Sequence, residues 1–583
     1  MATVTVTPTT RIPGGSFLIE ERKPEDVFTP EDFNEQHLLI AQTAEEFANK
    51  EIVPNIEKME HKDFAISREL VRKAGELGLS GVDVPEEYGG MQMDKVTSAI
   101  IADRLAKYGG FSTTWGAHTC IGTLPIVYFG TEAQKTRYLP LLASGEKVGA
   151  YALTEPGAGS DALNIRTKAT LSADGKHYLI NGQKMWITNG GFADIFTIFA
   201  KIDGEKFTAF IVEREMGVVS GREEPKLGLD GSSTTALILE NVKVPVENVL
   251  GEIGQGHKVA FNILNLGRLK LGTRNMGSAK QALNGALQYA LERQQFGRAI
   301  AEFGMIQQKL AQMAVLSYVG DAMVFRCLGD VDAALAAAGH ETLTILKTIE
   351  SFAVECSINK VWTSEALAWV VDEAIQVHGG YGYSKEYPPE RAYRDARITR
   401  IYEGTNEINR IIIAPRLLKN AAVAQLLIHP SAAAPPVADG LFPAERQILS
   451  AAKRLLLLTL AAAKNAYGDK LANEQEVLGH IADIAIETYA IESAVLRTSK
   501  LIAARGGVEG ATPVDIMHVY FSDAADKVEH SARQVLAALA ADAADRAPLQ
   551  DGIRSIASHE TFNTVAGRRR IATAVIKAGH YPY

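Results

Sequence analysis

The spacing of apolar residues changes twice along the chain, and these changes limit the folds that the sequence can adopt. Residues 31–148 and residues 257–425 carry apolar side chains at helical spacing, whereas residues 149–256 alternate apolar and polar side chains. Two turn signals in the alternating part, Asp174-Gly175 and Asp203-Gly204, lie between strand-like runs and predict hairpins. The pattern predicts a mainly α chain with a central β domain, in the order helical bundle, small antiparallel β barrel, helical bundle.

The two ends of the chain add further segments to this arrangement. A chain of 583 residues exceeds one ordinary hydrophobic core, so we expect several domains. Residues 1–30 contain many Thr, Pro and Gly residues and are expected to form an extended N-terminal arm. Residues 426–441 are rich in Ala, Pro and Ser and predict a linker, and residues 442–583 predict a C-terminal helical domain.

Composition argues against several classes of function. The formal net charge of -9 argues against a nucleic-acid partner, which needs a clustered basic face. Cys120, Cys327 and Cys356 are widely spaced, which fits a reducing compartment. No metal site is expected, because histidines such as His118 and His257 lack ligand partners at suitable spacing. The N-terminus lacks both an apolar signal core and an Arg-rich amphipathic helix, so we expect a cytoplasmic protein.

Two features of the C-terminal part leave a peripheral membrane contact open. The leucine-rich run Leu455–Leu460 is flanked by basic residues and predicts a buried helix, or at most one on a membrane surface. The basic triplet Arg568-Arg569-Arg570 is a second candidate for contact with an anionic membrane. No run approaches the roughly 20 apolar residues that a membrane-spanning helix requires.

Glu403 is the strongest candidate for a catalytic side chain. The residues that follow it, Gly404, Thr405 and Asn406, are poor helix interior but a good helix entry. Glu403 is therefore expected on a loop, from which a carboxylate can reach into a cleft as a general base. The alternative is a surface carboxylate favoured by the dipole of the helix that follows. Upstream, Gly379-Gly380 would let the backbone approach a ligand closely.

A nicotinamide-binding site is not expected, although one stretch matches the sequence motif of such a site. Gly157, Gly159 and Ala162 satisfy G-x-G-x-x-A, but such a site requires a helix directly after the glycines. Here a strand-like run and the hairpin signal at Asp174-Gly175 follow instead.

Three stretches together resemble the acyl-CoA dehydrogenase family of flavoproteins. They are Tyr151–Asp161, Gln376–Tyr383 and Arg400–Asn409, and they stand in the family's order within a resemblance that covers about residues 35 to 420. The C-terminal addition resembles the very-long-chain branch of the family, in which the extra domain packs against the bundle of a homodimer. The resemblance implies the fold order that the apolar spacing predicts.

The resemblance also implies a reaction. It is the FAD-dependent α,β-dehydrogenation of an acyl-CoA of medium to long chain to trans-2-enoyl-CoA in fatty-acid β-oxidation, with electrons passed to an electron-transfer flavoprotein. Glu403 aligns with the base that removes the α proton, and its backbone N–H with a donor to the thioester oxygen. The second base location of the family is occupied here by Gly267, which strengthens the assignment to Glu403.

Further site residues follow from the same resemblance. Those that align with FAD-binding positions are Tyr151, Leu153, Thr154, Ser160, Trp186, Thr188, Arg293, Phe296, Gln376, Gly380, Thr405 and Glu407. Those that align with substrate contacts are Ser160 and Arg268. Arg293 and Phe296 resemble a pair that reaches the FAD of the neighbouring subunit.

Each of these residues also has an ordinary structural interpretation. Trp186 in an alternating strand is more often a core residue than a cofactor wall, but Thr188, two residues on, would share its face. Arg293 can be a solvated residue at a helix end. Arg268 can be an ordinary charged residue of a helix, and Ser160 can be a loop residue whose hydroxyl has no special role.

Two positions depart from the family pattern, and two rival functions remain. Gly304 and Glu407 stand where many members have Gln, and a carboxylate at 407 would repel a diphosphate. The same fold could serve an acyl-CoA oxidase, which would release peroxide. A non-catalytic assembly protein could also retain the scaffold, but Glu403, Trp186 and Arg293 are all present.

Overall fold

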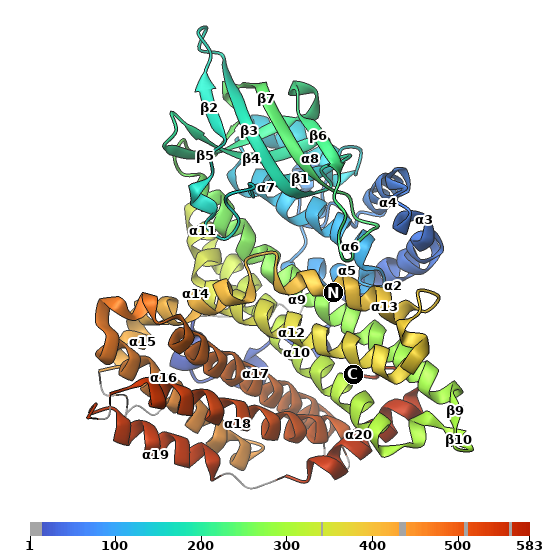
Figure 1. The fold of residues 1–583 in the computed structure, drawn as a ribbon, viewed down its shortest axis with the longest axis vertical. Helices are drawn as coiled ribbons and strands as arrows, with labels where there is room; N and C mark the ends of the chain where they lie inside the picture. Colours follow the sequence, from blue (N-terminus) through green and yellow to red (C-terminus); the bar gives the residue numbers. More distant parts are fainter. Residues whose placement is uncertain are drawn as a thin grey trace.

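The protein is stacked in three parts along its longest axis (Figure 1). The computed structural model describes residues 14–339, 342–428, 430, 439–506, 511–540, 542–558 and 562–583. The sheet lies at one end, a bundle of long helices lies in the middle, and the C-terminal helices lie at the other end. This order confirms the predicted fold class, a central β domain between helical parts with a C-terminal helical addition.

The first helical part packs beside the sheet. Its main helices are α2 (Glu35–Phe47), α3 (Ile56–Glu60), α4 (Phe64–Glu76), α5 (Lys95–Leu105), α6 (Gly109–Gly116), α7 (Leu124–Phe129) and α8 (Glu132–Ala143). Side chains fix where several of them begin: Asn34, Asp94 and Thr131 each accept a hydrogen bond from a backbone N–H of the first turn. One turn, residues 117–122, continues α6 as a wider helix and carries the buried His118.

The central part is an eight-stranded sheet. Its strands are β1 (Gly149–Ala152), β2 (Lys168–Leu171), β3 (His177–Thr188), β4 (Ile195–Ile202), β5 (Lys206–Glu213), β6 (Val219–Glu223), β7 (Thr234–Pro245) and β8 (Val249–Leu250). Both predicted hairpins are confirmed, as β2–β3 and β4–β5. Asp203 and Gly204 adopt φ values of 54° and 78°, which suit the tight turn that the Asp-Gly pair predicts.

The sheet differs from the antiparallel prediction in two pairings. β4 pairs in parallel with both β1 and β2, and the remaining strand pairs are antiparallel. The local hairpin signals could not show this, because the parallel pairs join strands that are distant in sequence.

The middle part consists of α9 (Gly256–Glu292), α10 (Gly304–Ala338), α11 (Thr342–Ser351), α12 (Ala353–His378), α13 (Pro388–Ala396), α14 (Asn406–Lys419) and α15 (Ala421–Leu426). The C-terminal part consists of α16 (Pro443–Tyr467), α17 (Gln475–Arg505), α18 (Thr512–Ala538), α19 (Arg546–Ala557) and α20 (Thr564–Ala578). Both parts contribute to one continuous hydrophobic core, so the C-terminal helices are packed onto the bundle. Most of the predicted linker, residues 429 and 431–438, lies outside the described residues.

The leucine-rich run is buried in α16, as one of its two interpretations predicted. Among the residues that the structure describes, no helix is both long and apolar enough to cross a membrane. In the basic triplet, Arg568 pairs with Asp523 at 2.6 Å and Arg570 pairs with Asp515 at 2.5 Å. These pairs partly neutralise the triplet.

From residue 14 on, the N-terminal segment is not the extended arm that its composition predicted, and residues 1–13 of that prediction lie outside the described residues. Residues 14–32 contain α1 (Ser16–Ile19) and two further helical turns, Pro24–Asp26 and Pro30–Asp32. Phe17 is fully buried, with its ring edge-on to that of Tyr489 in α17. The apolar pair Phe17-Leu18 supplies burial that outweighs the local Pro and Gly content.

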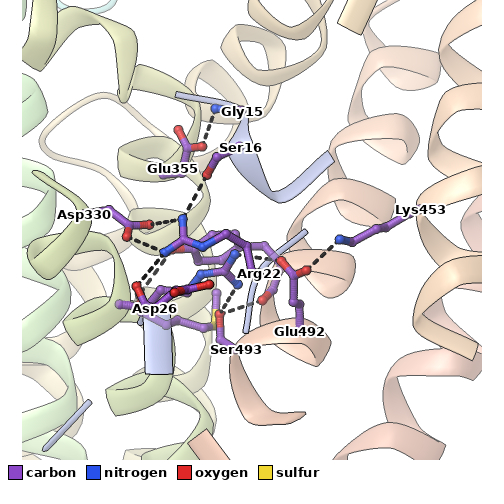
Figure 2. Close-up of polar contacts among 12 residues, drawn as sticks. Gly15, Ser16, Arg22, Asp26, Asp330, Glu355, Lys453, Glu492 and Ser493 are labelled. Carbon is purple, nitrogen blue, oxygen red and sulfur yellow. Dashed lines mark hydrogen bonds and ion pairs between the residues drawn. The ribbon is translucent and has the colours of Figure 1, made fainter. Parts of the chain in front are cut away.

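A network of buried charges joins this segment to the bundle and to the C-terminal part (Figure 2). Arg22 donates to both carboxylate oxygens of Asp330 in α10, at 2.7 and 3.2 Å. Glu492 in α17 accepts from Arg326 in α10 at 2.7 Å and from Lys453 in α16 at 2.6 Å. Because these side chains are buried, loss of one partner leaves an uncompensated charge in a medium of low dielectric constant.

Glu492→Ala should therefore destabilise the contact between the bundle and the C-terminal part strongly. We expect a loss of about 3–5 kcal/mol, the usual cost of breaking a buried ion pair. Glu529→Ala removes the carboxylate of an exposed pair with Arg533 on α18 and should cost at most about 1 kcal/mol. Urea unfolding followed by circular dichroism compares the two variants, and equal midpoints would contradict the expectation.

Candidate functional site

Glu403 lies on a left-handed turn between the helical turn Arg397–Arg400 and α14. Its φ is 57° and that of Gly404 is 78°, so two consecutive residues occupy a region that favours glycine. Thr405 caps α14 by accepting the N–H of Ile408 at 3.2 Å. The predicted loop with a capping residue is therefore present. A non-glycine residue held in this conformation indicates a turn that its surroundings determine.

Three side chains hold the carbonyl groups of this turn. Arg268 Nε of α9 donates to the carbonyl of Glu403 at 3.1 Å. Lys360 Nζ of α12 and Asn409 Nδ2 of α14 each donate to the carbonyl of Gly404 at 2.8 Å. Three helices thus fix the backbone, and the carboxylate of Glu403 is left free for another role.

The Glu403 carboxylate is buried without a hydrogen-bond partner on Oε2 among the described residues. Burial raises its pKa above the usual value, and the positive charges of Arg268, Lys360 and Arg274 offset part of that rise. A Cβ at Gly267 would stand 3.0 Å from Oε2, so the glycine on α9 provides the space that the carboxylate occupies. This combination is typical of a general base rather than of a surface carboxylate.

A cavity opens in front of this carboxylate. Gly267 and Leu271 of α9 line one side, residues of α6 such as Trp115 line another, and Thr188 at the end of β3 lines a third. The cavity therefore lies between the sheet and the two helical parts. It brings the predicted residues Glu403 and Thr188 together.

The sheet presents an exposed tryptophan two residues before Thr188. Trp186 is 55% exposed and has a φ of 60°, within an irregularity between Lys184 and Ile187 in the pairing of β3 with β7. This β-bulge breaks the strict alternation on which we based a shared face for Trp186 and Thr188. Both side chains are nonetheless more exposed than those of Lys184 and Ile187. Trp186 is therefore not a core residue.

The predicted residues of β1 lie next to the same strand. Tyr151 and Leu153 are buried, and Met185 N donates to the carbonyl of Thr154 at 2.9 Å. Burial raises the pKa of Tyr151 well above its usual value, and the negative charge of Glu403 adds to this rise. Arg268 is buried and also donates to Asn265 at 3.0 Å.

A buried ion pair holds the loop that follows β1. Glu155 accepts from Lys184 Nζ at 2.8 Å and from the N–H of Thr167 at 3.1 Å. Burial lowers the pKa of Lys184 to about 8, against the opposing charge of Glu155. Ser160 in this loop is exposed, and β2 rather than a long helix follows, as expected for a loop that is not a dinucleotide-binding turn.

The remaining predicted residues form a second group at the far end of α9 and α12. Phe296 stands at the tip of the hairpin β9 (Gln294–Gln295) and β10 (Arg298–Ala299), with a φ of 53° and 93% of its surface exposed. Arg293 and Gly380 line one cavity, and the guanidinium of Arg293 is 5.6 Å from the ring centre of Tyr381. Gln376 is exposed near the end of α12. Figure 1 shows this hairpin distant from β3.

Two predicted residues serve the start of α14 instead. The hydroxyl of Thr405 caps the helix, and the side chain of Glu407 is exposed in its first turn. Hydrogen bonds from its own backbone N–H and from Thr405 lower the pKa of Glu407, so this carboxylate is ionised.

Lys360 and Arg274 also belong to the site but were not predicted from the sequence. Lys360 is buried in α12 and donates to Gly404 and to Asn406 Oδ1, and burial lowers its pKa to about 7. A lysine between Ile358 and Val361 in an apolar helix was the available signal. Arg274 lines the cavity of Glu403 from α9, and its polar neighbours Thr273 and Asn275 gave no such signal.

Comparison with protein families agrees with this architecture. Models described as the N-terminal, middle and C-terminal domains of acyl-CoA dehydrogenase match residues 34–146, 150–242 and 254–418. A further model, also described as an acyl-CoA dehydrogenase C-terminal domain, matches residues 451–551.

Individual proteins are similar over most of the chain. A probable acyl-CoA dehydrogenase of Bacillus subtilis is 44% identical over 97% of this chain and 98% of its own. The mitochondrial very long-chain specific acyl-CoA dehydrogenase of Rattus norvegicus is 43% identical over 60% of this chain and 53% of its own.

Solved structures give the same result. A Bacillus anthracis acyl-CoA dehydrogenase complexed with FAD is 45% identical and superposes with a TM-score of 0.94 over 98% of this chain and 100% of its own. Butyryl-CoA dehydrogenase from Megasphaera elsdenii is 37% identical, with a TM-score of 0.61 over 67% of this chain and 99% of its own. From its domains, its full-length relative and its fold, the chain belongs to the acyl-CoA dehydrogenase family.

Proposed function

We propose that this protein uses FAD to dehydrogenate acyl-CoA thioesters of medium to long chain to trans-2-enoyl-CoA, with Glu403 as the base. The observation that carries the proposal is the buried Glu403 carboxylate, which has no described partner on Oε2 and faces a cavity. Electrons would pass to an electron-transfer flavoprotein.

The residues of the site fit FAD. An exposed Trp186 and the neighbouring Thr188 supply a wall for a flat ring next to the cavity of Glu403. Arg293 supplies a permanent positive charge for a diphosphate, and a Cβ at Gly379 or Gly380 would meet no atom within 4 Å. FAD, when bound, accepts the hydride equivalent that leaves the β carbon.

The chain itself handles the proton and the thioester. Glu403 takes the α proton, and its raised pKa makes the carboxylate a better base near neutral pH. The pair of electrons left at the α carbon requires a polarised thioester oxygen. The backbone N–H of Glu403 is suited to this role, because it is not among the described backbone donors to a protein acceptor.

The separation of the two groups of predicted FAD residues supports a homodimer. Trp186 and Thr188 lie by the sheet, whereas Arg293, Phe296 and Gly380 lie at the far end of the bundle. One FAD that contacts both groups would therefore take them from two subunits. The exposed Phe296 at the hairpin tip is accounted for if a partner covers it.

Glu403→Gln tests the base. Anaerobic mixing with octanoyl-CoA should bleach the oxidised flavin band of the wild-type holoenzyme. The variant should bind FAD, but its flavin band should bleach more slowly by a factor of about 10³ or more. Glu386→Gln, in an exposed loop, is the matched control and should behave as the wild type. A variant that turns over at the wild-type rate would refute the assignment. If the holoenzyme in air releases peroxide at the turnover rate, the protein is instead an acyl-CoA oxidase.

Lys360→Met tests the electrostatic setting of the base. The positive charge of Lys360 lowers the pKa of Glu403, so its removal should raise that pKa. Because the reaction needs ionised Glu403, the acid limb of the pH–rate profile should move to higher pH. Lys464→Met on the exposed side of α16 is the control. An acid limb that stays in place while the rate falls would assign Lys360 a purely structural role.

Arg293→Ala tests the shared cofactor site. The variant should bind FAD about 10-fold more weakly or worse, because a hydrogen-bonded charge is lost. Arg298→Ala alters the same hairpin and should retain wild-type affinity, since that guanidinium stacks 4.1 Å from the ring centre of Phe303. Flavin content after dialysis is measured together with mass by light scattering. A monomeric holoenzyme would contradict the shared site.

A further inference from the structure

Two cavities follow one another along a single face of α9. The cavity in front of Glu403 is lined by Gly267, Leu271 and Arg274, which are spaced at i, i+4 and i+7. The second cavity is lined by Arg274, Ser278 and Gln281, which continue the same face. Arg274, with Thr113 and Tyr402, lines both, so these three side chains stand at the boundary.

The guanidinium of Arg274 spans the space between the walls at this boundary. Its Nη1 donates to the carbonyl of Ser112 in α6 at 3.3 Å, and its Nη2 donates to the hydroxyl of Tyr402. Gly116 of α6 lies close to the guanidinium, since a Cβ there would be in ordinary contact with Nη1 at 3.5 Å. The arginine therefore joins α9, α6 and the Glu403 loop across the passage.

Arg274 has no carboxylate within ion-pair distance among the described residues, whereas its neighbour Lys270 pairs with Asp83 at 3.2 Å. An arginine held only by a carbonyl, a hydroxyl and an aromatic ring can be displaced without separating an ion pair.

Most of the free space lies beyond Arg274. The cavity on the Glu403 side is about 70 Å³, and the second is about 270 Å³. The second cavity has apolar walls suited to an alkyl chain, including Ala282, Leu367 and Val371. The distance along α9 from Gly267 to Arg274 is about 10 Å at the usual helical rise. A butyryl chain is shorter than this distance, and a palmitoyl chain is longer.

We propose that Arg274 is a gate that sets acyl-chain preference. Its guanidinium separates a compartment for short chains from a second compartment, which longer chains reach only by displacing the guanidinium. The inference rests on the proposed function and names a determinant of its substrate range. Short chains leave the guanidinium in place. Long chains move it away from Ser112 and Tyr402, which costs hydrogen bonds to a charged group.

The test compares chain lengths within each variant of the holoenzyme. Arg274→Ala removes the gate, and Arg274→Met removes its charge and hydrogen bonds but keeps a long side chain in case the alanine variant does not fold. Lys258→Met removes an exposed cation of the same helix, outside the lining of both cavities, and is the matched control. We measure kcat/KM for palmitoyl-CoA and butyryl-CoA and compare their ratio. The effect of Arg274 on the basicity of Glu403 cannot explain a rise in this ratio, because loss of the charge would raise the pKa of Glu403 for butyryl-CoA at least as much as for palmitoyl-CoA.

We expect the ratio of palmitoyl to butyryl activity to rise about 10-fold or more in both Arg274 variants, the value of one or two charged hydrogen bonds, and to stay unchanged in Lys258→Met. An unchanged ratio in Arg274 variants that still oxidise butyryl-CoA would overturn the gate and leave the proposed function intact. Wild-type protein that binds FAD but is reduced by no acyl-CoA would overturn both.

Discussion

The candidate site depends on the carboxylate of Glu403, whose Oε2 is buried and which has no ion-pair partner among the described residues. Such a group is costly, and the structure limits the cost by holding the backbone around it rather than the carboxylate itself. Arg268 and Lys360 bring positive charge close to Glu403 while donating to carbonyl groups of its turn. Oε2 is left without a described partner, and the charges of the two side chains that fix the turn also moderate the pKa of Glu403, the base that we propose.

Three separate parts of the chain must meet for this site to exist. The sheet contributes Trp186 and Thr188, α9 contributes the space at Gly267, and the loop before α14 contributes Glu403. No described residue of the N-terminal segment or of the C-terminal helices lines the cavity of Glu403. These two parts cover the far side of α10 and α12, where buried charges join them. These contacts therefore stabilise the side of the bundle that lies away from the sheet, while its other side faces the sheet.

The structural features that could be predicted from the sequence are those that depend on local patterns. The change of apolar spacing located the sheet, Asp-Gly pairs located both hairpins, and the residues after Glu403 located its loop and helix cap. Contacts between distant segments were beyond such patterns. The bulge at Trp186, the parallel pairings of β4 and the docking of Phe17 all depend on partners far away in the chain. Lys360 and Arg274 were missed for the same reason, since their roles come from what they face across the bundle.

Arg274 connects two properties of the site that are usually treated apart. It stands at the boundary between the two cavities, and its charge is one of three that lower the pKa of Glu403. If a long acyl chain displaces the guanidinium, the base loses part of that positive charge while the chain excludes water from the cavity. Both changes raise the pKa of Glu403 and strengthen it as a base. Under the gate that we propose, a long substrate would thus meet a stronger base than a short one, which offsets part of the cost of opening the passage.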